Sequence, residues 1–317
     1  MSRIYVLHEN STWVEPLRAA FDRFGLSYEE WFLDERMVAL DQEPPQGVFY
    51  NRMSASSHTR GHRYAPELTH VVLKWLERHG RRVVNSSRAL ALEVSKVSQY
   101  AALNRAGIRT PRTVAAVGRD KVLEAAHAFA DGPYILKPNR GGRGVGVRHF
   151  ESIEAIADYL DGVPDNEQPV DGVWLIQDYI SSPEPRITRC EFIGGHFHYA
   201  VHVDTRDGFE LCPADSCQVD NEVGPSPNKF TIDRQFDGPI LSRYLDFLTT
   251  NEIEIAGIEF IRASSGELFT YDVNTNTNYN AQAEAEAGVP LTGMEAIACF
   301  LGEEWARLPD QAASHYR

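Results

Sequence analysis

The middle of the chain reads Tyr134-Ile135-Leu136-Lys137-Pro138-Asn139-Arg140-Gly141-Gly142-Arg143-Gly144-Val145-Gly146-Val147-Arg148-His149-Phe150, a glycine-rich turn between two strand-like runs. Glycine adopts positive φ angles without a steric penalty and lets backbone N–H groups approach phosphate oxygens closely. The lysine at the end of the first run and the arginines in the turn add positive charge. The stretch therefore predicts a polyphosphate-binding loop; the alternative is an ordinary hairpin with glycines at its turn.

The elements on either side of this turn exclude two common nucleotide-binding loops. A P-loop requires GxxxxGK[ST] followed by a helix, whereas Gly146 is followed by Val147 and Arg148 in a strand pattern. A dinucleotide-binding fingerprint requires GxGxxG at the start of a helix, and no frame of the turn fits it. We therefore expect a β-hairpin flap that closes over a nucleotide.

The composition indicates a globular protein that acts on a small anionic ligand. The 317 residues are 43% apolar, yet no apolar run approaches the ~18 residues of a membrane span. The net charge of −14 argues against nucleic-acid binding, and the basic residues gather locally, around 137–148 and 186–189. We expect neither a nucleic-acid partner nor a membrane partner.

The cysteines and the first residues favour a cytoplasmic location. Cys190, Cys212, Cys217 and Cys299 form no CxxC pair and are typical of reduced thiols. Residues 1–8 enter a strand pattern directly and contain no signal-peptide core. A redox or metal role for Cys212 and Cys217 stays open.

Strand and helix patterns alternate before the flap, and paired strand patterns follow it. Before the flap we expect strands at 3–8, 28–33, 47–50 and 83–84, and helices at 13–25, 66–79, 86–90, 93–106 and 119–130. After it we expect helices at 152–160, 234–251 and 290–301, and strands at 173–176 (running into the segment 177–180), 186–193, 197–203, 256–262 and 268–273. The first part predicts a small α/β layer with a parallel sheet.

A second cluster of functional side chains lies on a predicted hairpin formed by 257–261 and 268–274. Asp272 and Asn274 are two residues apart and therefore point to one face, where Glu259 can join them. Such oxygen ligands suit Mg²⁺ or Mn²⁺, and buried carboxylates are costly unless they are paired or metal-bound. The alternative is the solvent-facing polar side of an edge hairpin. Phosphate-binding cations and Mg²⁺ ligands together meet the two requirements of an ATP site.

These motifs, in this order, resemble a known family. They are Val83-Val84-Asn85, Lys96, Ala106-Gly107-Ile108-Arg109-Thr110-Pro111, the flap with Lys137, Gln177-Asp178-Tyr179-Ile180, Arg189, and the set Glu259, Asp272 and Asn274. The arrangement is similar to the ATP-grasp superfamily, and within it to the ribosomal-protein glutamate ligases and related amino-acid ligases. The likeness covers about residues 83–300, whereas residues 1–82 resemble the preceding domain of that family in pattern only.

The resemblance implies an α/β (α+β) ATP-grasp fold in three parts. An N-terminal Rossmann-like preceding domain is expected at 1–90, a small central lid subdomain with the flap at 91–175, and a C-terminal antiparallel-sheet subdomain with the metal site at 176–317. It also implies ATP with Mg²⁺ or Mn²⁺, carboxylate and amine substrates that are small molecules or peptides, and a homodimer or homotetramer.

The resemblance also gives each motif residue a role. Lys96 and Lys137 would contact the ATP phosphates, which would be covered by Arg140, Gly141, Gly142, Arg143 and Gly144. The adenine would lie against Gln177, Asp178, Tyr179 and Ile180. Arg189, together with Lys137, would stabilise the transferring phosphoryl group, and about two Mg²⁺ would be held by Glu259, Asp272 and Asn274.

Two departures from the family bear on metal and substrate. The second acid is Asp272, which is shorter than the glutamate usually found there. After Asn274 the family usually continues with a small residue, Pro and Gly, whereas this chain has the polar segment 275–280. We expect this segment, with Asn276, to face the acceptor substrate.

The loop after the 47–50 strand contains further candidates for substrate binding. Arg52 and Ser54 can bind a substrate carboxylate there, and a plain polar loop is the alternative. Asp215 is a candidate for contacting a substrate amine.

Histidines form two further patterns. His196, His198 and His202 alternate along a predicted hairpin and can form a metal cluster, although surface or substrate-lining histidines are the alternative. His58 and His62 lack the HExxH context of a zinc protease.

The sequence therefore predicts an ATP-dependent carboxylate–amine ligase that forms an amide through an acyl phosphate and releases ADP and phosphate. One alternative is an ATP-grasp kinase that phosphorylates a small-molecule hydroxyl, although the acidic balance counts against a polyanionic acceptor. The other is a nucleotide-binding regulatory module without turnover.

Overall fold

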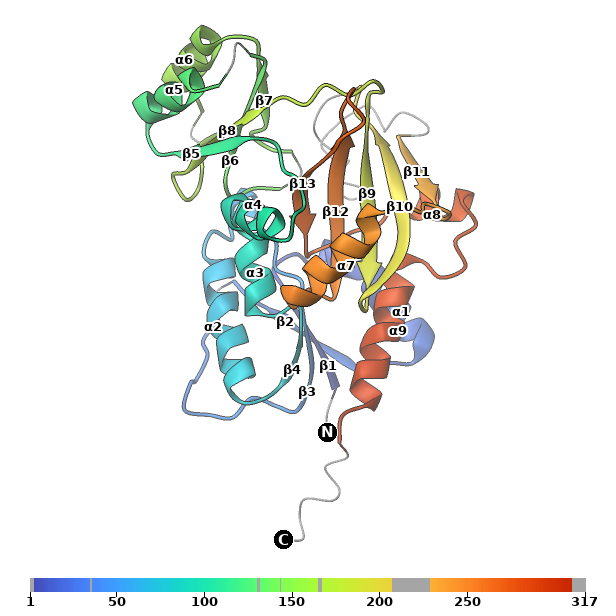
Figure 1. Ribbon diagram of the computed structural model, residues 1–317. Helices are drawn as coiled ribbons and strands as arrows, with labels where there is room; N and C mark the ends of the chain where they lie inside the picture. The colour runs from blue at the N-terminus through green and yellow to red at the C-terminus, as the bar shows by residue number, and fades with distance from the viewer. Residues whose placement is uncertain are drawn as a thin grey trace.

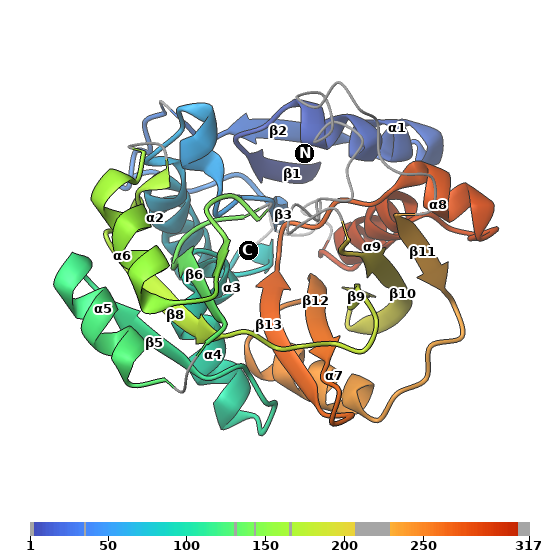
Figure 2. The ribbon, with the colours of Figure 1, turned by 90° about the horizontal axis from the view of Figure 1, so that it is seen from above.

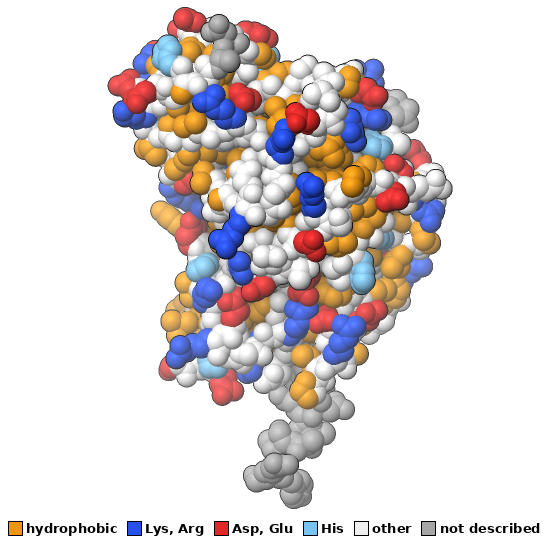
Figure 3. Space-filling view, viewed as in Figure 1, with side chains coloured by type: hydrophobic (Ala, Val, Ile, Leu, Met, Phe, Trp, Pro, Cys, Tyr) orange, Lys and Arg blue, Asp and Glu red, His pale blue; other side chains and the backbone are white. Residues whose placement is uncertain are grey.

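The computed structural model describes residues 3–34, 36–129, 132–142, 144–164, 167–206 and 229–309. These residues form three β-sheets, one parallel and two antiparallel, each covered by helices (Figure 1). Seen from above, the three sheets are arranged around a common centre (Figure 2). On the face shown in Figure 3, basic and acidic side chains are interspersed. No helix within the described ranges is long and apolar enough to cross a membrane.

The first sheet is parallel and has the strand order β2-β1-β3-β4. Its strands are β1 (Arg3–His8), β2 (Tyr28–Phe32), β3 (Gly47–Asn51) and β4 (Arg82–Val84). The central strands β1 and β3 are apolar and buried on both faces, as parallel strands between helical layers must be. The predicted parallel α/β layer is confirmed.

Helices cover both faces of the first sheet. One face packs against α2 (Ala65–Arg78), and the other packs against α1 (Glu15–Phe24) and α9 (Gly293–Ala306). In Figure 1, α9 lies beside α1 although almost the whole chain separates them. The loops that leave the carboxyl ends of β1 and β3 contain the short helices η1 (Thr12–Val14) and η2 (Ser57–Arg60).

The second sheet forms a lid and has the antiparallel order β5-β8-β6-β7. It contains β5 (Thr113–Ala116), β6 (Tyr134–Pro138), β7 (Arg148–Phe150) and β8 (Trp174–Asp178), covered by α5 (Arg119–His127) and α6 (Ile153–Gly162). The predicted flap hairpin is present, with Leu136 opposite Arg148. Its second strand is shorter than expected, because Gly144 and Gly146 adopt positive φ angles of 76° and 74° and keep the turn irregular up to residue 147.

The third sheet is antiparallel and has the order β11-β10-β9-β12-β13. It contains β9 (Arg186–Ile193), β10 (His196–Asp204), β11 (Phe230–Asp233), β12 (Ile255–Arg262) and β13 (Leu268–Asn274). Its apolar face packs against α7 (Ile240–Thr250) and α4 (Lys96–Arg105), which follows α3 (Ser87–Glu93). The short helix α8 (Ala281–Glu286) lies near β11.

Both expected domain boundaries fall inside regular elements. The boundary after residue 90 interrupts α3, where Leu90 packs under the first sheet while Leu92 packs under the third. The boundary after residue 175 interrupts β8, which pairs with both β5 and β6 and so belongs to the lid. The lid sheet therefore extends to Asp178.

Two predicted helices in the C-terminal part of the chain start later than expected. The helix expected over 234–251 is α7, which begins only at Ile240, directly after Gly238 and Pro239. Proline is compatible with a helix start and not with its interior. In place of a helix over 290–301, α9 begins after Thr292, which forms a capping box with Glu295.

Candidate active site

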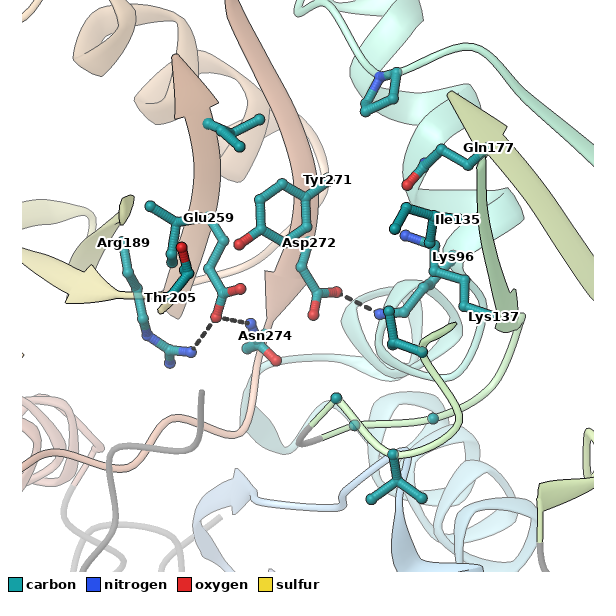
Figure 4. Close-up of a pocket in the computed structure, with 18 of the residues that line it drawn as sticks. Lys96, Ile135, Lys137, Gln177, Arg189, Thr205, Glu259, Tyr271, Asp272 and Asn274 are labelled. Carbon is teal, nitrogen blue, oxygen red and sulfur yellow. Dashed lines mark hydrogen bonds and ion pairs between the residues drawn. The ribbon is translucent and has the colours of Figure 1, made fainter. Parts of the chain in front are cut away.

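A cavity of about 440 Å³ lies where the lid, the third sheet and the loops of the first sheet meet. The lid contributes Lys137 and Gln177, and the third sheet contributes Arg189, Glu259 and Asp272 (Figure 4). Trp13, Ser54 and Ser56 come from the loops that follow β1 and β3. Ligands commonly bind at the carboxyl ends of parallel strands because loops of different strands converge there.

Lys137 is buried on β6 against aromatic side chains. Its Nζ donates a hydrogen bond to the hydroxyl of Tyr100 at 2.7 Å and lies over the rings of Tyr100 and Tyr271. Burial, followed by repulsion from Lys96, lowers the pKa of Lys137 to about 7. An anion placed next to this lysine would restore its charge.

Lys96 connects the flap to the third sheet. Its Nζ lies 2.6 Å from Oδ1 of Asp272, and its backbone N–H donates to the carbonyl of Asn139 at the base of the flap. The side chain of Asn139 also accepts from the N–H of Val97. The first turn of α4 and the flap are therefore held together beside the cavity.

The predicted metal hairpin places Glu259 and Asp272 directly opposite each other on β12 and β13. Asn274 donates through Nδ2 to Oε1 of Glu259 at 3.3 Å. Burial, with a contribution from Asp272, raises the pKa of Glu259, and Arg189 opposes that shift. Two carboxylates on one face, each next to a basic side chain, are hard oxygen ligands of the kind that would hold a divalent cation.

Arg189 lies between two carboxylates on the third sheet. Its Nη1 is 2.9 Å from Oε1 of Glu259, and its Nε donates to Glu191. Burial raises the pKa of Glu191 to about 7, although Arg189 opposes the shift. Glu191 was not among the residues expected at the site, although it lies two residues from Arg189 and therefore on the same strand face.

The predicted adenine segment borders the same cavity. Gln177 and Asp178 end β8, and Tyr179 and Ile180 follow them along the cavity wall. The side chain of Gln177 donates to the hydroxyl of Tyr100 at 3.0 Å and so joins the network around Lys137.

The flap residues separate into two groups. Gly141, Gly142 and Gly144 line the cavity. Arg140 does not, because its guanidinium group donates to Glu67 of α2 at 2.7 Å, so the structure does not place it with the phosphate-binding candidates. Arg143 lies outside the described residues, as do three other residues singled out from the sequence, Asp215, Cys212 and Cys217.

The candidate substrate-binding residues also fall into two groups, on the cavity surface and behind it. Ser54 and Asn276 line the cavity, whereas Arg52 lies behind its wall, 2% exposed, with its guanidinium group bonded to segment 276–278. Glu93 was not expected from the sequence to belong to the site. It lines the cavity and accepts hydrogen bonds from the N–H groups of Ala55 and Thr275, which connects the two loops.

The described residues contain no cluster of three or more His, Cys, Asp or Glu side chains arranged to hold a metal ion. The metal cluster considered for His196, His198 and His202 is therefore not formed. A β-bulge interrupts the register between Phe197 and Tyr199, and His202 pairs with the hydroxyl of Thr188 instead.

Solved structures of low sequence identity share this architecture over nearly the whole chain. The ATP-grasp ligase PsnB, solved with a minimal precursor, superposes with a TM-score of 0.65 at 17% identity, covering 96% of this chain and all of that one. D-alanyl-alanine synthetase A from Vibrio cholerae gives 0.66 at 11% identity, covering 96% and 99%. The chain has the ATP-grasp fold. The D-cycloserine synthetase DcsG gives 0.62 at 15% identity and covers 95% and 99%.

Curated sequences agree with the resemblance to ATP-grasp amino-acid ligases. A probable alpha-L-glutamate ligase of Enterobacter sp. (strain 638) is 24% identical over 196 residues, which are 62% of this chain. The alpha-aminoadipate–LysW ligase LysX of Sulfurisphaera tokodaii is 25% identical over 103 residues, 32% of this chain and 36% of that protein. The match spans 60% of the Enterobacter ligase and 44% of two Vibrio vulnificus ligases. No protein-family model matches the chain.

Proposed function

We propose that the chain is an ATP-dependent carboxylate–amine ligase. One observation carries the proposal: a single cavity brings together two buried lysines of the phosphate side, the paired carboxylates Glu259 and Asp272, and a neutral polar wall at Ser54 and Asn276. The first two groups suit a metal-bound triphosphate, and the neutral wall leaves room for a second substrate. The ATP-grasp fold and the ligases among its relatives support this assignment.

In the proposed reaction a carboxylate oxygen attacks the γ-phosphorus of ATP, and the bond to the ADP oxygen breaks. An amine then attacks the carbonyl carbon of the acyl phosphate, phosphate leaves, and the amine nitrogen loses a proton. Lys96 and Lys137 hold the phosphates, and Arg189 stabilises charge that develops during transfer. Glu259, Asp272 and Asn274 would hold Mg²⁺ or Mn²⁺, which neutralises phosphate charge when bound.

In the proposed reaction, the lid excludes water from the cavity. Gly141, Gly142 and Gly144 carry no side chains that would obstruct phosphates, and β6 and β8 place Lys137 and Gln177 behind them. Exclusion of water matters because an acyl phosphate hydrolyses readily, which would waste ATP.

Product analysis tests the proposal. The protein is incubated with ATP, Mg²⁺ and pools of amino acids and short peptides, and products are examined by mass spectrometry. A ligase yields ADP, phosphate and a conjugate that has lost one water. A phosphorylated acceptor would instead indicate the kinase, and nucleotide binding without any product would indicate the regulatory module.

The proposal includes a cytoplasmic location and a homodimer or homotetramer, as the resemblance implies. Light scattering coupled to gel filtration measures the oligomeric state, and cell fractionation measures the location.

A further inference from the structure

Arg52 is a buried cation whose partners are all uncharged. Its guanidinium group donates to Oδ1 of Asn276 at 3.2 Å, to the carbonyl of Thr277 at 3.0 Å and to Oδ1 of Asn278 at 2.9 Å. Its Nη1 lies 3.5 Å from the sulfur of Met294. Among the described residues, no carboxylate forms an ion pair with Arg52, although only 2% of the residue is exposed.

Other arginines around the cavity are neutralised within the protein. Arg60, which packs over Trp13, forms an ion pair with the buried carboxylate of Glu9 at 2.6 Å. Arg189 is held between Glu191 and Glu259. Burying a charge without a counter-charge is costly, so the charge of Arg52 favours an anion that none of the described residues provides.

The contacts of Arg52 also orient two amides toward the cavity. Because Arg52 binds the Oδ1 atoms of Asn276 and Asn278, the Nδ2 groups are left as donors, and no residue in the described ranges accepts from them. Both asparagines line the cavity. Neutral donors backed by a buried cation form a site for an anion, because the charge polarises the amides while they make the contact.

The backbone of the segment places these amides next to the metal hairpin. Asn274, Asn276 and Asn278 line the cavity, whereas the alternating residues Thr275 and Thr277 are 1% and 0% exposed. Thr275 is fixed by hydrogen bonds to Glu93, and Thr277 by its hydroxyl to Tyr279. The three amides therefore form a row that begins at the predicted Mg²⁺ ligands.

We propose that Asn276 and Asn278, polarised by Arg52, bind the carboxylate group of the acid substrate. This inference rests on the ligase function proposed above. A single buried charge suits a monoanion, whereas phosphate groups would meet the two lysines on the lid side. Arg52 is then a positioning residue, and the two asparagines make the contact.

Thermal unfolding and calorimetry with separate probes test the site. Wild type is measured with ADP and Mg²⁺, and with acetate, L-alanine and L-glutamate, each against sodium chloride of equal ionic strength. We expect at least one carboxylate to raise the Tm above the chloride control. If ADP and Mg²⁺ stabilise the protein while none of the carboxylates does, the anion site is wrong. If ADP and Mg²⁺ do not bind, the ligase proposal fails instead.

The variant Asn278→Asp gives Arg52 the missing carboxylate. We expect its Tm without ligand to rise above that of wild type, and the dissociation constant of the stabilising carboxylate to increase by about tenfold to a hundredfold. ADP binding with Mg²⁺ should be unchanged. The matched control is Asn280→Asp, two residues further along, where the side chain caps α8 by accepting from the N–H of Ala283. Equal carboxylate binding by Asn278→Asp and wild type would overturn the proposal.

Two substitutions of Arg52 separate charge from structural support. Arg52→Lys keeps the cation but loses the forked contact with both amides, and Arg52→Gln loses the charge as well. If the charge attracts the ligand, Arg52→Lys binds the carboxylate more tightly than Arg52→Gln. If Arg52 only supports segment 276–278, the two variants lose carboxylate binding equally, which would contradict an anion site.

Discussion

Gly257 lies directly against the guanidinium group of Arg189. A Cβ atom at position 257 would be 2.3 Å from Nη2 and 2.5 Å from Cζ of Arg189. Arg189 pairs in register with Glu259, two residues along β12 from Gly257. The missing side chain at position 257 therefore provides the space in which Arg189 reaches Glu259.

The substitution Gly257→Ala should displace Arg189 and reduce ligase turnover. Removing a preorganised group that stabilises transition-state charge typically costs about 10²–10³ in kcat. Binding of ADP with Mg²⁺, measured by calorimetry, should change little, because Lys96 and Lys137 are not disturbed.

The matched control for this substitution is Gly162→Ala in α6. A Cβ at position 162 would have no neighbour within 4 Å, so turnover should stay at the wild-type value. Wild-type turnover in Gly257→Ala would show that Arg189 tolerates displacement and does not act in the reaction.

Nucleotide binding should depend on pH through Lys137. Since its pKa in the free protein is about 7, burial leaves the side chain largely neutral at about pH 8, whereas bound phosphates favour the charged form. Binding should therefore take up a proton, and affinity should fall as pH rises above about 7. Calorimetry at pH 8 in two buffers of different ionisation enthalpy measures the proton uptake.

The substitution Lys137→Met should abolish this proton uptake and weaken nucleotide binding. Lys121→Met is the control, because Lys121 is exposed and pairs with Glu124 on the surface of α5. Identical binding heats of the wild type in both buffers would count against a neutral Lys137 in the free protein.

Glu93 should stabilise the fold as well as the cavity. It accepts hydrogen bonds from the N–H of Ala55 and from the N–H and hydroxyl of Thr275. Glu93→Ala leaves these buried donors without a partner, so the free energy of unfolding should fall by about 2 kcal/mol or more. Urea denaturation measures the change in the free energy of unfolding. The control is Glu124→Ala, because Glu124 is exposed and pairs with Lys121 on the surface. This substitution should lower the free energy of unfolding by less than about 1 kcal/mol.

The Mg²⁺ concentration that the protein needs should depend on Asp272. We expect Asp272→Asn to need a higher Mg²⁺ concentration for ADP binding and to lose acid-dependent ADP release by about 10²-fold or more. A Mg²⁺ titration of both quantities checks the prediction, with Asp246→Asn on the exposed side of α7 as control. An unchanged Mg²⁺ requirement would remove Asp272 from the metal site.

Local patterns predicted the two hairpins that border the candidate site. The flap hairpin follows from glycines between apolar strands, and the shared face of Asp272 and Asn274 follows from the two-residue period of a strand. The start of α9 was expected too early, although Thr292 and Glu295 have the spacing of a capping box.

Contacts between distant parts of the chain were not predictable from such patterns. Arg52 and Asn278 are separated by 226 residues, and Arg140 reaches Glu67 across 73. Both arginines had been expected to face ligands. Instead, Arg52 binds two asparagine amides behind the cavity wall, and Arg140 binds the carboxylate of Glu67 on α2. The charge of an arginine does not indicate which of these partners it meets. Tertiary packing decides which partner a side chain meets.

The position of α9 affects the order in which the chain folds during synthesis. Ile297 and Leu301 of this helix complete the core on one face of the first sheet, where they meet residues such as Val6. Synthesis proceeds from the N-terminal side, so the part of this face that α9 covers stays exposed until the second and third sheets have been made, although α1 is already available. We expect the first sheet to be the last of the three to complete its native core, and a nascent chain that lacks α9 to bind chaperones.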